Sequence, residues 1–269
     1  MKSIVESIGI IGCGNMGSAI ASALAEKGTI SLRDMSLYDK DTRKRDILAE
    51  KTGCRKRDLF DLVKSSEILI VAIKPRDFDE LAESIARNIR TTQTIVSVMA
   101  GIKIHAIAEK LGKDLAIARA MPNMSAFVRE SMTCVSFNAK VQNENGILSI
   151  FASIGRVLEI EECFMDAVTA LSGSGPAYFF YLADAMIKAG RETGLDKKIA
   201  EELVIQTFYG SAALMRDSGG TPEDLIEKVA SKGGTTETAL KVFDEKRVKD
   251  AVKEAVAKAK KRAEELSRG

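Results

Sequence analysis

The sequence predicts an α/β fold, in which an N-terminal Rossmann-type domain with a mainly parallel sheet precedes an all-α C-terminal domain. Short β-branched runs alternate with amphipathic helical segments through the first half of the chain, which is typical of βαβ units. A glycine-rich segment, Gly12 to Gly17, directly follows the first of these runs. Helical spacing dominates after about residue 160. We therefore expect a Rossmann domain over residues 1–160 and a helical domain over residues 161–269.

Apolar spacing and helix-ending residues delimit the elements of the first half. Gly28 and Gly53 follow two helical patterns at the position where a left-handed residue commonly ends a helix. Pro75 ends a buried apolar run. The predicted strands cover residues 8–11, 35–38, 67–73, 94–99 and 115–118, and the predicted helices cover 15–27, 41–52, 77–89 and 102–110. Right-handed crossovers between such strands give a parallel sheet.

The second half contains few β-branched runs and reads as a series of helices. The predicted helices cover residues 165–171, 176–193, 197–216, 222–229, 237–243 and 246–266. The last one carries an apolar stripe on one side, formed by Val248, Val252, Ala255, Val256 and Ala259. Such a stripe requires a partner surface.

Composition excludes several classes of protein. Forty basic and 38 acidic residues leave a net charge of +2, which gives no electrostatic reason to bind nucleic acid or an anionic membrane. The four cysteines lack C-x-x-C spacing and His105 is the single histidine, so we expect no metal site and no disulfide framework. A signal peptide and an apolar run of about 18 residues are both missing. We expect a cytoplasmic protein that does not bind membranes.

Gly12-Cys13-Gly14-Asn15-Met16-Gly17 matches the G-x-G-x-x-G pattern between a predicted strand and a predicted helix. In such a loop the first glycine permits the turn, the second lets a pyrophosphate approach the backbone, and the third lets the helix pack on the strand. Free N–H groups at the helix start then hold the anion. We therefore expect NADPH or NADH as the cofactor, bound through Gly12, Gly14, Asn15, Met16 and Gly17. The alternative is a tight turn that binds nothing.

Asp39, at the end of the second predicted strand, is the expected acceptor for the ribose diol, and this would favour NADH. Lys40, Arg43 and Lys44 follow it and could hold the 2′-phosphate of NADPH instead. The choice between the two cofactors therefore stays open. An alternative role for Asp39 is to cap the next helix, for which Asp41 and Thr42 compete.

The carboxyl ends of the other strands complete a dinucleotide site in this fold. These ends are Ala72-Ile73-Lys74-Pro75 and Met99-Ala100-Gly101, whose small residues would let the cofactor lie close to the backbone. Asn123 follows the fifth predicted strand and is a candidate to bind the nicotinamide amide. Its alternative role is that of a turn residue after Pro122.

Two segments of the helical half combine small and hydroxyl residues. Ser172 to Tyr178 is expected to be an elbow between two helices, with Pro176 at the first position of the second helix. It would approach either a ligand or a neighbouring helix. The other segment, Ser231-Lys232-Gly233-Gly234-Thr235-Thr236, precedes a predicted helix, so its free N–H groups could bind a carboxylate. The alternative is a simple threonine N-cap.

Taken in order, these motifs resemble those of the pyrroline-5-carboxylate reductase family from about residue 7 to residue 265. The resemblance implies reduction of 1-pyrroline-5-carboxylate, a carboxylate with a cyclic imine, to L-proline by NADPH or NADH, the last step of proline biosynthesis. It implies a homodimer through the helical domains, which in that family often assembles further into rings. The substrate would bind at Ser231, Gly233, Gly234, Thr235 and Thr236, with Thr236 as the catalytic residue near the imine nitrogen.

The chain departs from the family pattern at four residues. Met124 and Ser125 replace a usual Thr-Pro, Lys232 replaces a frequent proline, and Leu59 aligns with an asparagine. Two alternatives stay open: another NAD(P)-dependent imine or β-hydroxyacid oxidoreductase, and a non-catalytic cofactor sensor of the same fold. The former enzymes typically carry a lysine in the first helix of the second domain, which residues 176–185 lack. A sensor would need no substrate-binding loop.

Overall fold

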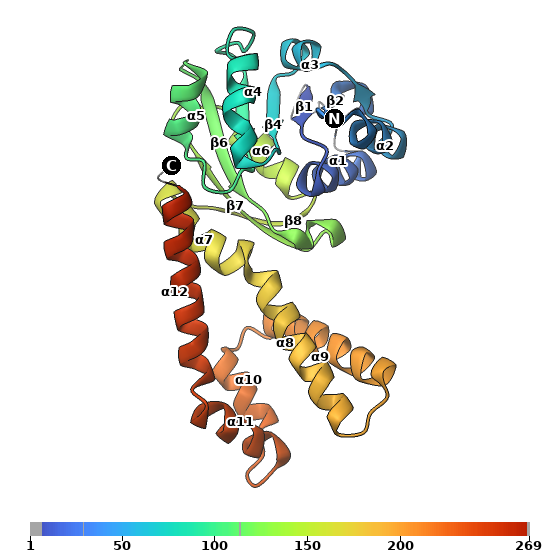
Figure 1. Cartoon of the computed structure of the whole chain (residues 1–269), viewed down its shortest axis with the longest axis vertical. Helices are drawn as coiled ribbons and strands as arrows, with labels where there is room; N and C mark the ends of the chain where they lie inside the picture. The colour runs from blue at the N-terminus through green and yellow to red at the C-terminus, as the bar shows by residue number, and fades with distance from the viewer. Residues whose placement is uncertain (1–6, 29, 113, 268–269) are drawn as a thin grey trace. The chain divides into compact units, whose positions relative to one another are not determined.

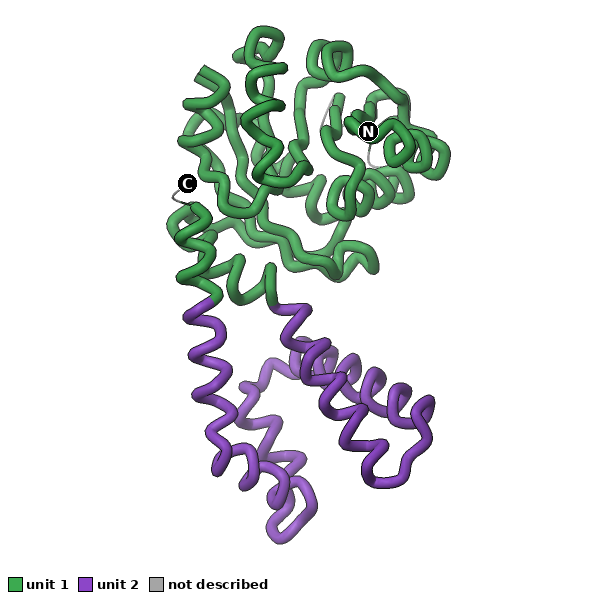
Figure 2. Tube along the Cα trace, viewed as in Figure 1, with its two compact units in different colours: residues 1–174, 259–269 green, residues 175–258 purple. Residues whose placement is uncertain are grey.

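The computed structural model describes residues 7–28, 30–112 and 114–267. They form two compact units: the described residues up to 174 and from 259 to 267 make unit 1, and residues 175–258 make unit 2 (Figure 2). None of the helices in the described part of the chain is long and apolar enough to span a membrane.

Unit 1 is built on one sheet, which contains eight strands among the described residues, in the order β3-β2-β1-β4-β5-β6-β7-β8 (Figure 1). The strands are β1 (Ile8–Ile11), β2 (Met35–Tyr38), β3 (Arg55–Lys56), β4 (Ile68–Val71), β5 (Thr94–Ser97), β6 (Ala116–Met121), β7 (Ser131–Phe137) and β8 (Gly155–Glu159). Only β6 and β7 pair in antiparallel fashion, and all the other neighbours are parallel. The prediction of a mainly parallel Rossmann-type sheet is confirmed.

Helices cover both faces of this sheet. The α-helices of unit 1 are α1 (Asn15–Lys27), α2 (Thr42–Thr52), α3 (Leu59–Ser65), α4 (Phe78–Ile85), α5 (Ile104–Leu111), α6 (Glu144–Phe151) and α7 (Met165–Val168). Alternate residues of a strand point to opposite faces. Thus Ile10 packs with α1, α2 and α6 in one apolar cluster, whereas Ile11 packs with α3, α4 and α5 in the other. Burial of these two clusters stabilises unit 1.

Unit 2 is all helical, as predicted. It contains α8 (Gly175–Glu192), α9 (Lys197–Asp217), α10 (Pro222–Val229), α11 (Thr235–Glu245) and the first part of α12 (Val248–Leu266). The elbow expected at residues 172–178 is reduced to a bend at Ser174, where one helix ends and the next begins. Residues Thr169–Gly173 form a π-helix, in which Ser174 N donates to Thr169 O at 2.8 Å, and α8 follows directly. The small residues of this segment lie in the wide turn of the π-helix and at the start of α8 rather than in a loop.

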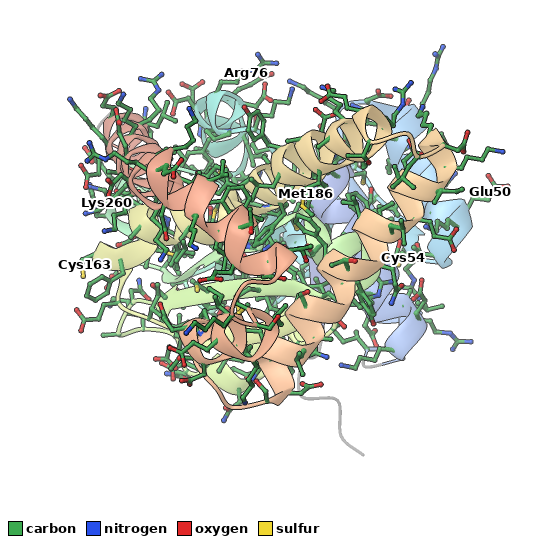
Figure 3. All side chains as sticks on the ribbon, turned by 90° about the horizontal axis from the view of Figure 1, so that it is seen from below. Glu50, Cys54, Arg76, Cys163, Met186 and Lys260 are labelled. Atoms are coloured by element: carbon green, nitrogen blue, oxygen red, sulfur yellow. The ribbon has the colours of Figure 1, made fainter. Side chains whose placement is uncertain are left out.

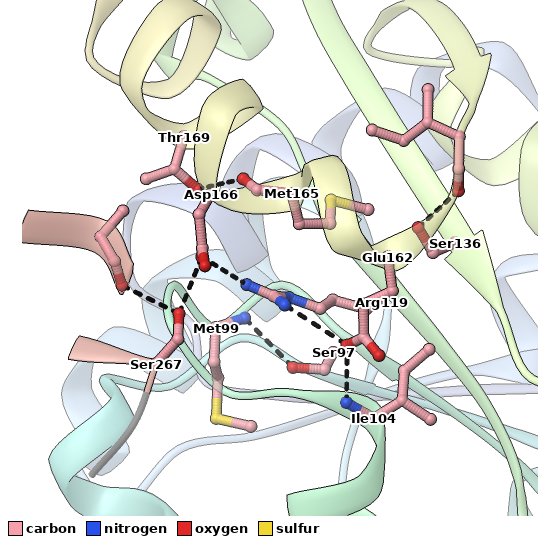
Figure 4. A network of polar contacts seen from close by, with 12 residues as sticks. Ser97, Met99, Ile104, Arg119, Ser136, Glu162, Met165, Asp166, Thr169 and Ser267 are labelled. Atoms are coloured by element: carbon pink, nitrogen blue, oxygen red, sulfur yellow. Dashed lines mark hydrogen bonds and ion pairs between the residues drawn. The ribbon is translucent and has the colours of Figure 1, made fainter. Parts of the chain in front are cut away.

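The division into units differs from the predicted boundary at residue 160, because residues 161–174 and 259–269 belong to unit 1. A buried arginine on β6 accounts for this difference (Figure 4). Arg119, 3% exposed, forms ion pairs with Glu162 at 3.3 Å and Asp166 at 3.7 Å. Ser267 Oγ, just after α12, donates to Asp166 at 2.7 Å. The segments that lead into and out of unit 2 are thereby held to the sheet.

Candidate functional site

A cavity of about 310 Å³ lies where β1, β2 and β4 end, which is where this fold class binds ligands. We call it the strand-end cavity. Of the predicted cofactor-binding residues, seven line it: Gly12, Gly14, Asp39, Lys40, Ala72, Ile73 and Lys74. Lys44, a further candidate to hold a 2′-phosphate, lines it with them. Sequence reasoning overlooked Arg76, Asp77 and Glu80, which also line it from the segment after β4. Leu59, one of the departures from the family pattern, lies there too.

At two positions of the loop after β1, the backbone and its neighbours leave room only for glycine. Gly12 has a φ of +103°, and a Cβ atom there would lie 2.6 Å from the carbonyl oxygen of Ala72. A Cβ atom on Gly17 would overlap the carbonyl oxygen of Gly12. Since no side chain fits, these residues shape the turn and bring α1 against β1. Neither observation by itself indicates a ligand.

Gly14 differs, because nothing within the chain requires a glycine there. Its φ is −72°, which any residue adopts, and no atom lies within 4 Å of an added Cβ atom. It is the N-cap residue of α1 and makes no side-chain cap hydrogen bond, so N–H groups of the first turn remain open. A ligand that approaches this backbone closely would explain the glycine. The loop therefore fits a pyrophosphate.

The carboxylate of Asp39 is fixed by two backbone groups. Its Oδ2 accepts from Cys13 N at 2.7 Å, and its Oδ1 accepts from Asp41 N at 2.8 Å. The helix-capping alternative for Asp39 is excluded, because Asp41 caps α2 by accepting from Arg43 N at 3.1 Å. Each carboxylate oxygen keeps a further lone pair for a ligand hydroxyl. Burial, and then the charge of Asp39, raises the pKa of the Cys13 thiol to about 12, so the thiol stays protonated.

The other predicted cofactor residues lie outside the lining of the strand-end cavity: Asn15, Met16, Gly17, Pro75, Met99, Ala100, Gly101 and Asn123. The Met99 side chain is buried in the core, and a Cβ atom on Gly101 would lie 3.2 Å from Leu266 O. Asn123 accepts from Ser125 N and donates through Nδ2 to Ser172 O at 3.3 Å. The amide of Asn123 thus holds the turn after Pro122 and the π-helix, which corresponds to its alternative role as a turn residue.

In unit 2, the segment from Ser231 to Thr236, the Gly-Gly-Thr-Thr loop, leads into α11. Gly234 is the N-cap residue and no side chain caps the helix, so the threonine N-cap alternative is wrong. Thr235 and Thr236 are the first two residues of α11. N–H groups at these positions have no partner inside a helix. They are suited to bind an anion.

The two glycines of this loop shape it without offering donors. Gly233 has a φ of +74° and its N–H donates to Glu237 Oε2 at 2.6 Å, while Gly234 N donates to Ser231 O at 3.0 Å. Both N–H groups therefore already have partners within the loop, one a side-chain carboxylate and one a backbone carbonyl, and direct substrate contact by Gly233 and Gly234 stays a prediction. The Gly233 hydrogen bond, followed by contact with Lys241, lowers the pKa of Glu237, which remains charged at neutral pH.

Comparison with known proteins gives matches in both halves of the chain. A family model described as pyrroline-5-carboxylate reductase dimerisation matches residues 162–266, and one described as NADP oxidoreductase, coenzyme F420-dependent, matches residues 7–101. Pyrroline-5-carboxylate reductase 2 of Bacillus subtilis (strain 168) is 33% identical over 97% of this chain and 95% of its own.

Two solved structures extend the comparison to three dimensions. A pyrroline-5-carboxylate reductase from Coxiella burnetii superposes with a TM-score of 0.92 at 31% identity, covering 98% of this chain and 99% of its own. Pyrroline carboxylate reductase of Plasmodium falciparum with NADP bound gives a TM-score of 0.88 at 27% identity, covering 97% and 98%. The similarity extends over nearly the whole chain, and this chain belongs to the pyrroline-5-carboxylate reductase family.

Proposed function

We propose that this protein reduces 1-pyrroline-5-carboxylate to L-proline with NADPH or NADH, in the last step of proline biosynthesis. The observation that carries the proposal is similarity over nearly the full chain to proteins named for this activity. The open backbone at Gly14 and at Thr235 and Thr236 supplies an anion-binding position for each reactant. A cytoplasmic location remains a prediction from the sequence.

When bound, the nicotinamide cofactor supplies the hydride. In our proposal the chain binds and orients. The N–H groups at the start of α1 hold the pyrophosphate, and Asp39 accepts from the ribose hydroxyls. The N–H groups of Thr235 and Thr236 hold the substrate carboxylate, and the Thr236 hydroxyl hydrogen-bonds the imine nitrogen. A cyclic imine is basic enough to take up a proton near neutral pH, so no histidine base is needed.

The direct test follows NADH and NADPH oxidation at 340 nm with 1-pyrroline-5-carboxylate. We expect fast, saturable turnover. Reverse reaction of NAD⁺ with 3-hydroxyisobutyrate tests the β-hydroxyacid alternative and is expected to be absent. Tight cofactor binding without turnover of the pyrroline would contradict the proposal and favour another imine substrate or a sensor.

We predict that Gly14→Ala weakens binding of NADH and NADPH by about tenfold or more while thermal stability stays unchanged. The added Cβ atom meets no protein atom but occupies space that the pyrophosphate needs. Gly17→Ala is the matched control, because its Cβ atom overlaps Gly12 O and should lower the melting temperature. Fluorescence titration and calorimetry measure the two effects. Unchanged affinity in Gly14→Ala would show that the loop does not hold the cofactor.

We also propose a homodimer through unit 2, and rings of dimers as the family resemblance implies. Unit 2 buries little of its own apolar surface, because α10 and α11 contain no buried residue and α8 buries only Gly175. Exposed apolar side chains on α8 and α9 include Phe179, Phe180, Tyr181, Met186 (Figure 3), Leu203 and Tyr209. Exposed large apolar side chains in such number on two neighbouring helices favour a protein interface.

We predict that Phe180→Asp converts the dimer to monomer, because it would place a charge in a desolvated interface. Phe60→Asp is the control, since Phe60 is a comparably exposed aromatic residue on α3 of unit 1. Sedimentation equilibrium gives the mass of each variant and shows whether dimers assemble further. A dimeric Phe180→Asp variant would argue against this interface.

A further inference from the structure

An ion pair joins two loops that line the strand-end cavity. Lys40 follows β2, and Asp77 ends the short 3₁₀ helix Pro75–Asp77 after β4. Lys40 Nζ lies 2.9 Å from Asp77 Oδ1, and both residues line the cavity. Asp77 occupies the N-cap position of α4 but makes no cap hydrogen bond there. Its carboxylate is thus directed to Lys40 rather than to the helix.

Some of the charged side chains around the strand-end cavity form ion pairs and others do not. Asp39 presents a fixed carboxylate, and Lys40, the residue after it, is already paired. Lys44 lies 3.8 Å from Asp41. Lys74 and Arg76 (labelled in Figure 3) line the cavity from the segment after β4, and no ion pair of theirs occurs among the described residues. At the end of β2 the cavity is therefore faced by the carboxylate of Asp39 and by a lysine, Lys40, whose charge Asp77 neutralises.

This charge pattern bears on which nicotinamide cofactor can bind. The two cofactors differ only at the ribose 2′ position, which carries a hydroxyl in NADH and a dianionic phosphate in NADPH. A carboxylate at the end of the second strand accepts from the hydroxyl, whereas a phosphate requires a cation there. Lys40 is placed to be that cation, but Asp77 neutralises it. Asp77 also adds a negative charge that repels the phosphate.

We propose that Asp77 is a specificity-determining residue, which favours NADH over NADPH by holding Lys40 and by its own charge. The proposal rests on the proposed function, because it concerns the same cofactor site. Both side chains are charged at neutral pH: the hydrogen bond and charge of Asp77 raise the pKa of Lys40, and the hydrogen bond from Lys40 lowers the pKa of Asp77. The Lys40 side chain is 67% exposed, so its ammonium group is free to contact another anion when Asp77 is replaced.

Equilibrium binding of NADH and of NADPH, measured without any pyrroline, tests this inference separately from the proposed function. Wild-type protein should bind NADH more tightly. Asp77→Asn should shift the ratio of the two dissociation constants about threefold to tenfold toward NADPH, because Lys40 is released. Adding Lys40→Met to this variant should cancel most of the shift. Asp79→Asn is the control, because Asp79 is 68% exposed and pairs with Lys110 outside the cavity.

Two results would overturn the inference: tighter wild-type binding of NADPH than of NADH, or an unchanged ratio in Asp77→Asn. Arg76→Gln identifies the rival cation. If Arg76 held the 2′-phosphate, Arg76→Gln would weaken NADPH selectively and Asp77→Asn would leave the ratio where it was. Failure of the proposed function would look different, because the cofactors would bind with the expected ratio and the pyrroline would not be reduced.

Discussion

Thr236→Ala should lower kcat/KM for 1-pyrroline-5-carboxylate by at least about a hundredfold, with NADH binding unchanged. Thr236 is the second residue of α11, at an uncapped helix start, so its hydroxyl is placed beside open N–H groups. In the proposed mechanism this hydroxyl contacts the imine nitrogen while the backbone holds the carboxylate. The backbone contacts survive the substitution. We therefore expect the loss mainly in kcat, as steady-state kinetics would measure.

Two further variants identify the cause of that loss. Thr236→Ser keeps the hydroxyl and should recover most of the activity. Thr238→Ala removes a hydroxyl that donates to Gly234 O at 3.1 Å within the same helix, and it should change kcat/KM by less than about threefold. Wild-type kinetics in Thr236→Ala, or an equal loss in Thr238→Ala, would contradict a catalytic role for Thr236.

The residues of the loop after β1 and the acid after β2 were predictable, because their structural roles depend on local sequence. Gly12 and Gly17 have steric reasons within one strand–loop–helix unit, and Asp39 follows the next strand. Asp77 was overlooked because its importance depends on Lys40, which is distant in sequence and adjacent only once β2 and β4 flank β1. The hydrogen bonds of the Gly233 and Gly234 N–H groups were also not predictable. They depend on the position of the Glu237 side chain and on the geometry of the turn, which the spacing of residues in the sequence does not specify.

The fold was predictable where apolar spacing was strong and less so elsewhere. The antiparallel strand β7 received no prediction, because three polar residues, Ser131, Thr133 and Ser136, are buried in it. They are satisfied by tertiary hydrogen bonds, such as that from Ser136 Oγ to Ile160 O at 2.6 Å. The strand β8 is mostly exposed, and β3 has two residues, so neither leaves a periodic signal.

Arg119→Ala should destabilise the protein by about 3 kcal/mol, because it removes one partner of a buried charge cluster. The arginine side chain is 3% exposed on β6, and it is the only cation within ion-pair distance of Glu162 and Asp166 in the described part of the chain. Without it, two partly buried carboxylates would lose the cation that balances their charge. Glu162 also accepts from Ile104 N at 2.8 Å, so the start of α5 would be affected. The shift in the urea unfolding midpoint measures the loss.

The position of this cluster makes its loss more than local. Asp166 lies in α7, before unit 2, and Ser267 follows α12, after unit 2. Both are linked to Arg119, which is why unit 1 includes these segments. Arg119→Lys should be intermediate, because an ammonium group cannot reproduce the two-pronged contact. Lys110→Ala, which breaks an exposed pair with Asp79, should cost less than about 1 kcal/mol. If Arg119→Ala were no more harmful than Lys110→Ala, burial of the charge cluster would not be what joins the segments to the sheet.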